Sequence, residues 1–257
     1  CHKKKGVCLL ICIELNFILF YDHRSVLGLG NPLLDVIATC DEEFLKKYDL
    51  EANNAILAEA KHEKLCADLT EKFKVQYLAG GSVQNSMRVA QWFMQRSNVC
   101  TFFGCVGQDD FARQMKNKAE EDRLNAVYMV DPETPTGTCA CMITQNGKCR
   151  SLCAYLGASQ KFSIEHVKKN FEYVESARIF YVSGFHLIIS LEPTLLLAKH
   201  AHEFEHKLFV INLSAPYISQ FYSDKLLQVL PYVDLLFGNE TEADAFAKIQ
   251  KWDVSEF

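Results

Sequence analysis

The stretch VQYLAGGSVQNSMRVAQWFMQ, residues 75–95, combines a short apolar strand, a turn with two glycines and a helix. The glycine pair Gly80-Gly81 lets the backbone approach a ligand closely, and Ser82 is expected to cap the helix, whose first N–H groups point outward. Asn85 then lies in the first helical turn, where its amide offers both a donor and an acceptor to sugar hydroxyls. A plain strand–turn–helix corner without a ligand explains the same residues equally well.

The same alternation continues in both directions from this stretch. Predicted strands are Ser25–Asn31, Leu34–Thr39, Val75–Leu78, Val99–Gly104, Thr138–Thr144, Lys148–Tyr155, Arg178–Ser183, Leu208–Leu213 and Asp234–Gly238. Predicted helices are Asp41–Tyr48, His62–Phe73, Val83–Gln95, Asp109–Glu121, Glu192–Glu205 and Glu240–Ile249. Strands alternating with helices indicate an α/β fold with a mainly parallel sheet covered on both faces. Asn146-Gly147 lies between two β-rich runs and predicts a hairpin, hence a small β appendage.

Composition excludes several classes of protein. The 257 residues include 27 Lys and Arg against 32 Asp and Glu, a net charge of −5, so a nucleic-acid partner is not expected. Hydrophobic residues make up 49%, which excludes a disordered chain. The 11 cysteines contain no C-x-x-C pair, so we expect buried, reduced thiols and a cytoplasmic or also nuclear location.

Residues 1–24 are expected to be an N-terminal extension of unknown status. Val7–Tyr21 is apolar and follows three lysines, as in a signal peptide. However, Glu14 and Asn16 interrupt it, no small-residue cleavage site follows, and it is short for a membrane span. We therefore expect no membrane anchor, and assign residues 25–257 to the folded domain.

Familiar enzyme motifs are incomplete in this chain. The segment from Gly28 to Leu33 lacks the third glycine of a dinucleotide fingerprint, and no P-loop motif occurs. His202, Glu203 and His206 form a literal H-E-x-x-H, which would allow a zinc peptidase. A strand is predicted to begin directly after them, so a polar helix terminus is the favoured interpretation.

Two polar pairs follow predicted strands. Asn31 and Asp35 are four residues apart, and a carboxylate beside an amide can bind two vicinal hydroxyls, although Asn-Pro is also a common turn signal. Asn239 and Glu242 follow the last predicted strand, where α/β proteins bind ligands. This second pair suits an outer-sphere magnesium site, and ordinary helix capping explains it as well.

Together these blocks resemble the ribokinase-type family of sugar and nucleoside kinases, in particular its members that phosphorylate adenosine. The resemblance runs from Leu27 to the last residues. It rests on six blocks in order: Gly28–Asp35, Ala79–Ser86, Phe102–Gly107, Pro135–Cys139, Asn212–Pro216 and Phe237–Ala243. It implies a three-layer α/β sandwich with a small β lid, the lid coming from about residues 33–62 and 135–157, and with the C-terminal part of the fold incomplete.

The resemblance also implies roles for individual residues. Asn31, Asp35, Gly80, Gly81 and Asn85 would hold the ribose hydroxyls. The adenine slot would be lined by Leu57, Leu152, Ala154, Leu156 and, stacked on the base, Phe185. Arg150 would contact the transferred phosphate, and Asn239 with Glu242 would organise Mg²⁺ indirectly. The implied phosphoryl donor is ATP, the product is AMP for purine salvage, and a monomer is expected.

The family's Asp-Thr-Asn-Gly-Ala-Gly-Asp motif, which supplies the catalytic aspartate and the anion hole, does not occur in these 257 residues. No catalytic residue is therefore assigned, and the chain as given is expected to be inactive. A non-catalytic nucleoside-binding fragment or pseudoenzyme stays open as an alternative function.

Overall fold

The larger of two sheets contains six parallel strands in the computed structural model, which describes residues 24–252. Its order is β11-β10-β9-β1-β5-β6, and every neighbouring pair is parallel. The strands are β1 (Val26–Leu29), β5 (Cys100–Gly107), β6 (Asn125–Asp131), β9 (Ile179–Ser183), β10 (Leu208–Asn212) and β11 (Leu235–Phe237). The order reverses at β1, and open parallel sheets bind ligands at such a switch point, beyond the carboxyl ends of the strands.

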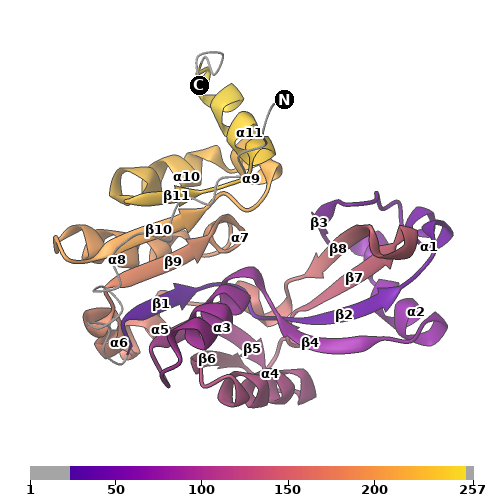
Figure 1. Ribbon diagram of the computed structural model, residues 1–257, viewed down its shortest axis with the longest axis horizontal. Coiled ribbons are helices and arrows are strands. Elements are labelled where there is room, and N and C mark those ends of the chain that lie inside the picture. The colour runs from indigo at the N-terminus through magenta and orange to yellow at the C-terminus, as the bar shows by residue number, and fades with distance from the viewer. Residues whose placement is uncertain (1–23, 253–257) are drawn as a thin grey trace, which may run out of the picture.

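Helices cover both faces of this sheet (Figure 1). One face packs against α5 (Ile164–Lys169), α6 (Phe171–Ser176), α8 (Leu191–His202) and α10 (Ser223–Val229) in the largest apolar core. The opposite face packs against α3 (Ser82–Met94) and α4 (Asp110–Glu121). The remaining helices are α7 (Gly184–Leu187), α9 (Pro216–Phe221) and α11 (Glu240–Gln250). This arrangement confirms the predicted three-layer α/β fold with a parallel central sheet.

A second, mixed sheet of five strands projects from the first (Figure 1). Its order is β3-β8-β7-β2-β4, with β2 parallel to β7 and antiparallel to β4. The strands are β2 (Leu33–Thr39), β3 (Ala55–Leu57), β4 (Gln76–Gly80), β7 (Thr138–Thr144) and β8 (Cys149–Tyr155). One face packs on α1 (Glu42–Lys47) and α2 (Leu65–Lys72). The hairpin predicted at Asn146-Gly147 is confirmed as the antiparallel β7–β8 pair.

Two expectations about this region are wrong, and one strand was missed. The strand predicted from Val75 was expected to lie in the mainly parallel sheet, but β4 runs back toward the start of β2 and pairs antiparallel with it in the lid, with Gly80 opposite Leu33. Ser82 does not cap α3: Gly81 occupies the cap with a φ of +95°, and Ser82 is the first helical residue. A Cβ at Gly81 would lie 2.2 Å from the carbonyl oxygen of Asn31, so this close corner requires glycine. Strand β6 was not predicted at all.

The proposed N-terminal extension lies almost wholly outside the described residues. Its apolar segment, residues 7–21, therefore receives no structural account. Within residues 24–252, no helix combines the length and the apolar character that crossing a membrane requires.

Asp109 connects the central sheet to the lid. Its Oδ1 accepts from the backbone N–H of Ala112, capping α4, and from Thr136 Oγ1, at 2.8 and 2.7 Å. Its Oδ2 accepts from the backbone N–H of Thr136 at 2.7 Å. Burial acts to raise the pKa of Asp109, but these hydrogen bonds outweigh it and leave the pKa below its ordinary 3.8. Asp109 thus fixes the segment that enters β7.

We expect Asp109→Ala to lower the free energy of unfolding by about 2–4 kcal/mol, since a helix cap and two further charge-assisted hydrogen bonds are lost. Because the folded pKa is lowered, this stabilisation is present at neutral pH and is lost as pH falls below 3.8. Urea unfolding at pH 7 measures the change. The control is Asp110→Ala, at an exposed neighbour. Equal destabilisation by the two substitutions would contradict this role.

Candidate functional site

The carboxyl ends of β9, β10 and β11 surround a cavity of about 420 Å³ beside the first turn of α3. Seven of its ten lining residues are polar, and the lining includes the predicted stacking residue Phe185 and the predicted magnesium pair. The lining residues are Ser82, Tyr181, Ser183, Phe185, Asn212, Ser214, Phe237, Gly238, Asn239 and Glu242. Ser183 was not anticipated: its hydroxyl is buried and has no hydrogen-bond partner among the described residues. A polar cavity therefore lies at one side of the switch point.

The predicted ribose residues meet where β1 passes into the lid. Gly80 and Gly81 end β4 directly against Asp35 and Asn31, so closely that a Cβ on Gly80 would lie 2.4 Å from the Asp35 carboxyl group. Asp35 is in strand β2, within the strand that was predicted over Leu34–Thr39. Four of the five proposed ribose residues thus lie together, because Gly80 packs against Asp35 and Gly81 packs against Asn31.

Asn31 is held by a residue that sequence reasoning missed. Its Nδ2 donates to the carbonyl oxygen of Phe185 at 3.1 Å, and its Oδ1 accepts from Nδ1 of His186 at 2.7 Å. Burial lowers the pKa of His186 from 6.5 to about 3, so the ring is neutral. Its Nδ1 must then carry the proton, since Oδ1 only accepts. No local pattern marks His186, because its partner is 155 positions away.

Asp35 supplies the carboxylate of the proposed ribose site. Burial raises its pKa from 3.8 to about 6, and nearby Arg150 and Arg88 partly oppose the rise. Arg150 extends from the exposed position of β8 that faces Ile143 of β7. A half-buried carboxylate is stabilised by hydroxyl donors that replace its lost hydrogen bonds to water, and two vicinal hydroxyls would supply such donors. The lid therefore presents one anion and one guanidinium toward the switch point.

The predicted adenine-slot residues gather on the same face of the lid. Leu57, Leu152, Ala154 and Leu156 belong to one apolar cluster with Cys139 and Cys141. Leu57 also packs in the neighbouring cluster that contains Phe185 and Tyr217, whose rings lie 6.2 Å apart. Apolar side chains thus pack continuously from this face of the lid to the ring of Phe185.

Asn239 and Glu242 form a complete capping box at the start of α11. Asn239 Oδ1 accepts from the backbone N–H of Glu242 at 2.8 Å, while each carboxyl oxygen of Glu242 accepts one bond from Asn239, at 3.0 and 3.1 Å. Each of these oxygens keeps a further lone pair. The pair can therefore cap the helix and still accept a hydrogen bond from a metal-bound water.

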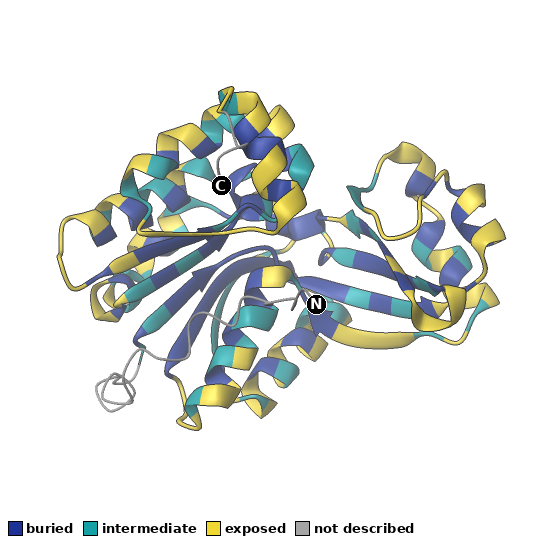
Figure 2. Cartoon of the chain, turned by 45° about the horizontal axis from the view of Figure 1, so that its top comes forward, coloured by how far each residue is buried: buried dark blue, intermediate teal, exposed yellow. Residues whose placement is uncertain are grey.

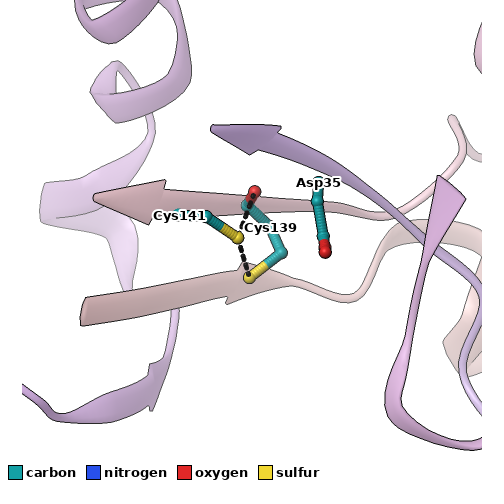
Figure 3. A group of neighbouring side chains, drawn as sticks. All are labelled: Asp35, Cys139 and Cys141. Atoms are coloured by element: carbon teal, nitrogen blue, oxygen red, sulfur yellow. Dashed lines mark hydrogen bonds between the residues drawn. The ribbon is translucent and has the colours of Figure 1, made fainter. Parts of the chain in front are cut away.

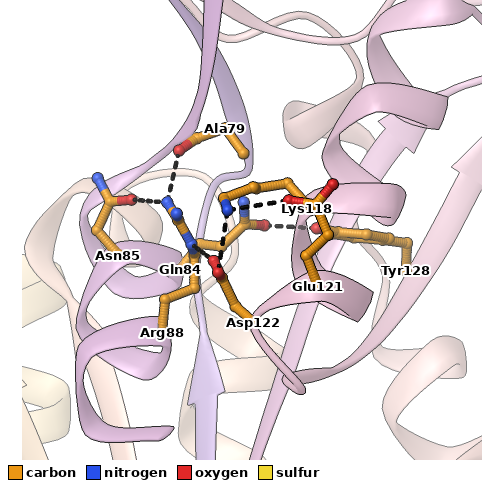
Figure 4. A network of polar contacts seen from close by, with 8 residues as sticks. All are labelled: Ala79, Gln84, Asn85, Arg88, Lys118, Glu121, Asp122 and Tyr128. Atoms are coloured by element: carbon orange, nitrogen blue, oxygen red, sulfur yellow. Dashed lines mark hydrogen bonds and ion pairs between the residues drawn. The ribbon is translucent and has the colours of Figure 1, made fainter. Parts of the chain in front are cut away.

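Asn85 is directed toward Arg88 (Figure 4). Its Oδ1 accepts from the Arg88 guanidinium at 3.1 Å, and the same guanidinium donates to the carbonyl oxygen of Ala79 at 2.9 Å. Arg88 also pairs with Asp122. The network joins α3, β4 and the end of α4, and Asn85 does not line the cavity that contains Phe185. Its role at the ribose stays a prediction.

The H-E-x-x-H residues do not assemble a metal site. Helix α8 ends at His202, with Glu203 as its C-cap, so His206 lies beyond the helix and the i, i+4 geometry is absent. Among the described residues, only Asp35, Cys139 and Cys141 bring three potential metal ligands together. The eight cysteines in this part of the chain are free thiols, and seven of them are buried.

A six-stranded parallel sheet with a separate lid sheet and polar groups at the switch point defines a sugar-kinase type of fold. The chain belongs to the family described as pfkB family carbohydrate kinase, whose sequence model matches residues 43–257. This finding and the relatives below confirm the predicted resemblance to ribokinase-type kinases.

Several of the similar proteins are adenosine kinases. Adenosine kinase 2 of Arabidopsis thaliana is 43% identical over 233 residues, which are 90% of this chain and 67% of that protein. The crystal structure of Anopheles gambiae adenosine kinase with P1,P4-di(adenosine-5) tetraphosphate is 48% identical, with a TM-score of 0.86, covering 90% of this chain and 71% of that one. Schistosoma mansoni adenosine kinase in complex with adenosine is 35% identical, with a TM-score of 0.85, covering 90% and 66%. The chain thus spans about two thirds of the length of these relatives.

Proposed function

We propose that this chain carries the nucleoside-binding part of an adenosine kinase, an enzyme that transfers a phosphoryl group from ATP to the 5′-hydroxyl of adenosine and forms AMP for purine salvage. The half-buried carboxylate of Asp35, packed against Gly80 beside the apolar face of the lid, is the observation that carries the proposal. It combines an acceptor for vicinal hydroxyls with a surface for a flat base, as a nucleoside requires. The adenosine-bound relative from Schistosoma mansoni supports this choice of ligand.

In this proposal the ribose lies between β1 and the lid. Asp35 accepts from the two ribose hydroxyls, and the glycine pair permits their close approach. The base enters the slot of Leu57, Leu152, Ala154 and Leu156, where Phe185 stacks on it. His186 is a positioning residue, because it fixes the amide of Asn31.

Magnesium and ATP are expected at the polar side of the site. Asn239 and Glu242 fit an outer-sphere role, since Mg²⁺ keeps several of its waters and each Glu242 oxygen has a free lone pair. When bound, Mg²⁺ neutralises charge on the phosphates. Arg150 is the proposed phosphate contact of the lid. A cytoplasmic or nuclear location agrees with the free thiols of this chain and stays a proposal.

Binding of the nucleoside distinguishes this function from that of a sugar kinase. We expect adenosine to bind more tightly than ribose or fructose, and Phe185→Ala to weaken adenosine binding by about 5- to 150-fold, since aromatic stacking on a base contributes about 1–3 kcal/mol. Isothermal titration calorimetry measures both effects. Phe221→Ala is the matched control, because Phe221 is 74% exposed and does not line the cavity. Tighter binding of ribose than of adenosine would contradict the proposal.

A nucleoside-binding protein without catalysis is the second candidate function. The family's aspartate-containing motif does not occur in these 257 residues, so a polypeptide of these residues alone is expected to bind adenosine without phosphoryl transfer. The two candidates share the same binding site, so adenosine binding supports both, and AMP formation separates them. The zinc peptidase is not proposed, because α8 ends before His206.

A further inference from the structure

Three potential metal ligands lie on the slot-facing side of the lid sheet (Figure 3). Asp35 of β2 and Cys139 of β7 are direct partners across the parallel pair, and Cys141 lies two residues along the same strand. Side chains two apart on a strand project from the same face. The two sulfur atoms are 3.8 Å apart, and all three ligand atoms lie within 4.8 Å of one another.

The spacing of the sulfur atoms matches a metal-bound pair. With metal–sulfur bonds of about 2.3 Å in a tetrahedron, two thiolates are separated by about 3.8 Å. The Cys139 and Cys141 sulfurs already have this separation without any movement of β7. The Asp35 carboxylate oxygen lies within 4.8 Å of both sulfur atoms and must come closer to share a cation with them.

A cationic side chain lies beside the three potential ligands. The Arg150 guanidinium acts electrostatically on the Cys141 thiol. The same guanidinium lies near Asp35, so it offsets the negative charge that the three ligands would gather. Cys139 and Cys141 are only 6% and 1% exposed, whereas Asp35 is half-buried, so access is from the carboxylate side.

We propose that Asp35, Cys139 and Cys141 form a site for a thiophilic divalent cation such as Zn²⁺ or Cd²⁺, with a fourth position open to water. Binding replaces two S–H bonds by two metal–sulfur bonds, the two protons pass to solvent, and the carboxylate supplies the third ligand. No electron is transferred. Two thiolates and one carboxylate carry three negative charges, so the site with a divalent cation bound has a net charge of −1, beside Arg150.

A bound cation would engage the carboxylate that is proposed for the ribose hydroxyls. The cation and adenosine are therefore expected to compete, and this expectation rests on the proposed function. The cation site itself does not rest on the proposed function, because it is inferred from the positions of three side chains. Failure of cadmium binding would leave adenosine binding intact, and cadmium binding without competition would remove only the link between the two.

Cadmium chloride is the probe, because cadmium–thiolate bonds absorb in the ultraviolet. The test uses the full chain with Cys1, Cys8 and Cys12 changed to serine, since these thiols lie outside the described residues, and a phosphine reductant. We expect one equivalent of Cd²⁺ to produce the band, and Cys141→Ser to weaken binding by at least about 100-fold, more than outer-sphere partners contribute. Cys153→Ser is the matched control, because Cys153 is a buried thiol on the opposite face of the same sheet.

Retention of tight stoichiometric binding by Cys141→Ser, or its loss in Cys153→Ser alone, would overturn the assignment. Cadmium nuclear magnetic resonance of the chain without substitutions at Cys139 or Cys141 gives a second readout that does not depend on the folding of a variant. A shift typical of two sulfur ligands with oxygen is expected. A shift typical of four sulfur ligands, or no bound cadmium at all, would contradict the site.

Discussion

A polypeptide of these 257 residues, incubated with adenosine, ATP and magnesium, is expected to form no AMP above background. Phosphoryl transfer depends on positioning and on electrostatic stabilisation of the transferred group. The aspartate that would accept the 5′-hydroxyl proton and the anion hole that would face the phosphoryl group belong to a motif that these residues do not contain. A positioned base contributes about 10²–10⁴ in rate and each oxyanion-type donor about 10²–10³, so their joint loss reduces turnover below detection.

The assay needs two controls. Arabidopsis adenosine kinase 2, a relative with 43% identity, serves as the positive control for AMP detection. Calorimetry on the same sample is expected to detect adenosine binding, which separates a lack of turnover from a lack of folding. AMP formation that Asp35→Ala abolishes would show that the chain itself is an active kinase, and would contradict the prediction.

Because the chain exposes apolar surface, its association state is measured together with its activity. Within the described residues, β11 is an edge of the central sheet, and its side chains Leu235, Leu236 and Phe237 are 38–42% exposed. Helix α3 exposes Trp92 and Phe93, at 70% and 64%. Figure 2 shows exposed residues along the outward faces of the helices. Open edges and apolar patches favour association between chains, so light scattering is needed beside each assay.

Asp35→Asn is expected to weaken adenosine binding by about 100-fold. The change removes a charge-assisted acceptor for two hydroxyls, each such bond contributing about 1.5–3 kcal/mol. In the unsubstituted chain, affinity is expected to fall as pH drops from 8 through about 6, where Asp35 takes up a proton. The variant should show no such dependence. Calorimetry between pH 5 and pH 8 measures both effects.

The same substitution is expected to stabilise the free protein at high pH. Because burial raises the folded pKa of Asp35, the stability associated with this group is full below pH 3.8 and is lost as pH rises through about 6. Asn carries no charge, so the variant should be about 1–3 kcal/mol more stable at pH 8 and nearly equal at pH 4. The control is Asp110→Asn, at an exposed carboxylate of α4. Weaker binding together with lower stability at pH 8 would indicate a structural role only.

The sequence by itself predicted the features that depend on local chemistry. Alternating apolar strands and amphipathic helices defined the α/β class, because their periodicity reports which face each segment buries. Asn146-Gly147 predicted the β7–β8 hairpin, and Asp109 and Asn239 begin α4 and α11 as helix-capping residues do. Family resemblance added the positions of the expected nucleoside pocket, which local patterns alone left ambiguous.

Only the tertiary structure decided where these segments lie and how the site is charged. The strand before Gly80 pairs with β2 in the lid, because pairing partners are chosen across the chain and leave no local signal. Gly81, and not Ser82, is the N-cap of α3, since the packing of Asn31 against it permits no Cβ. His186 binds Asn31 from 155 positions away, and burial raises the pKa of Asp35. These properties arise from contacts between distant residues and from exclusion of water, which exist only once the chain is folded.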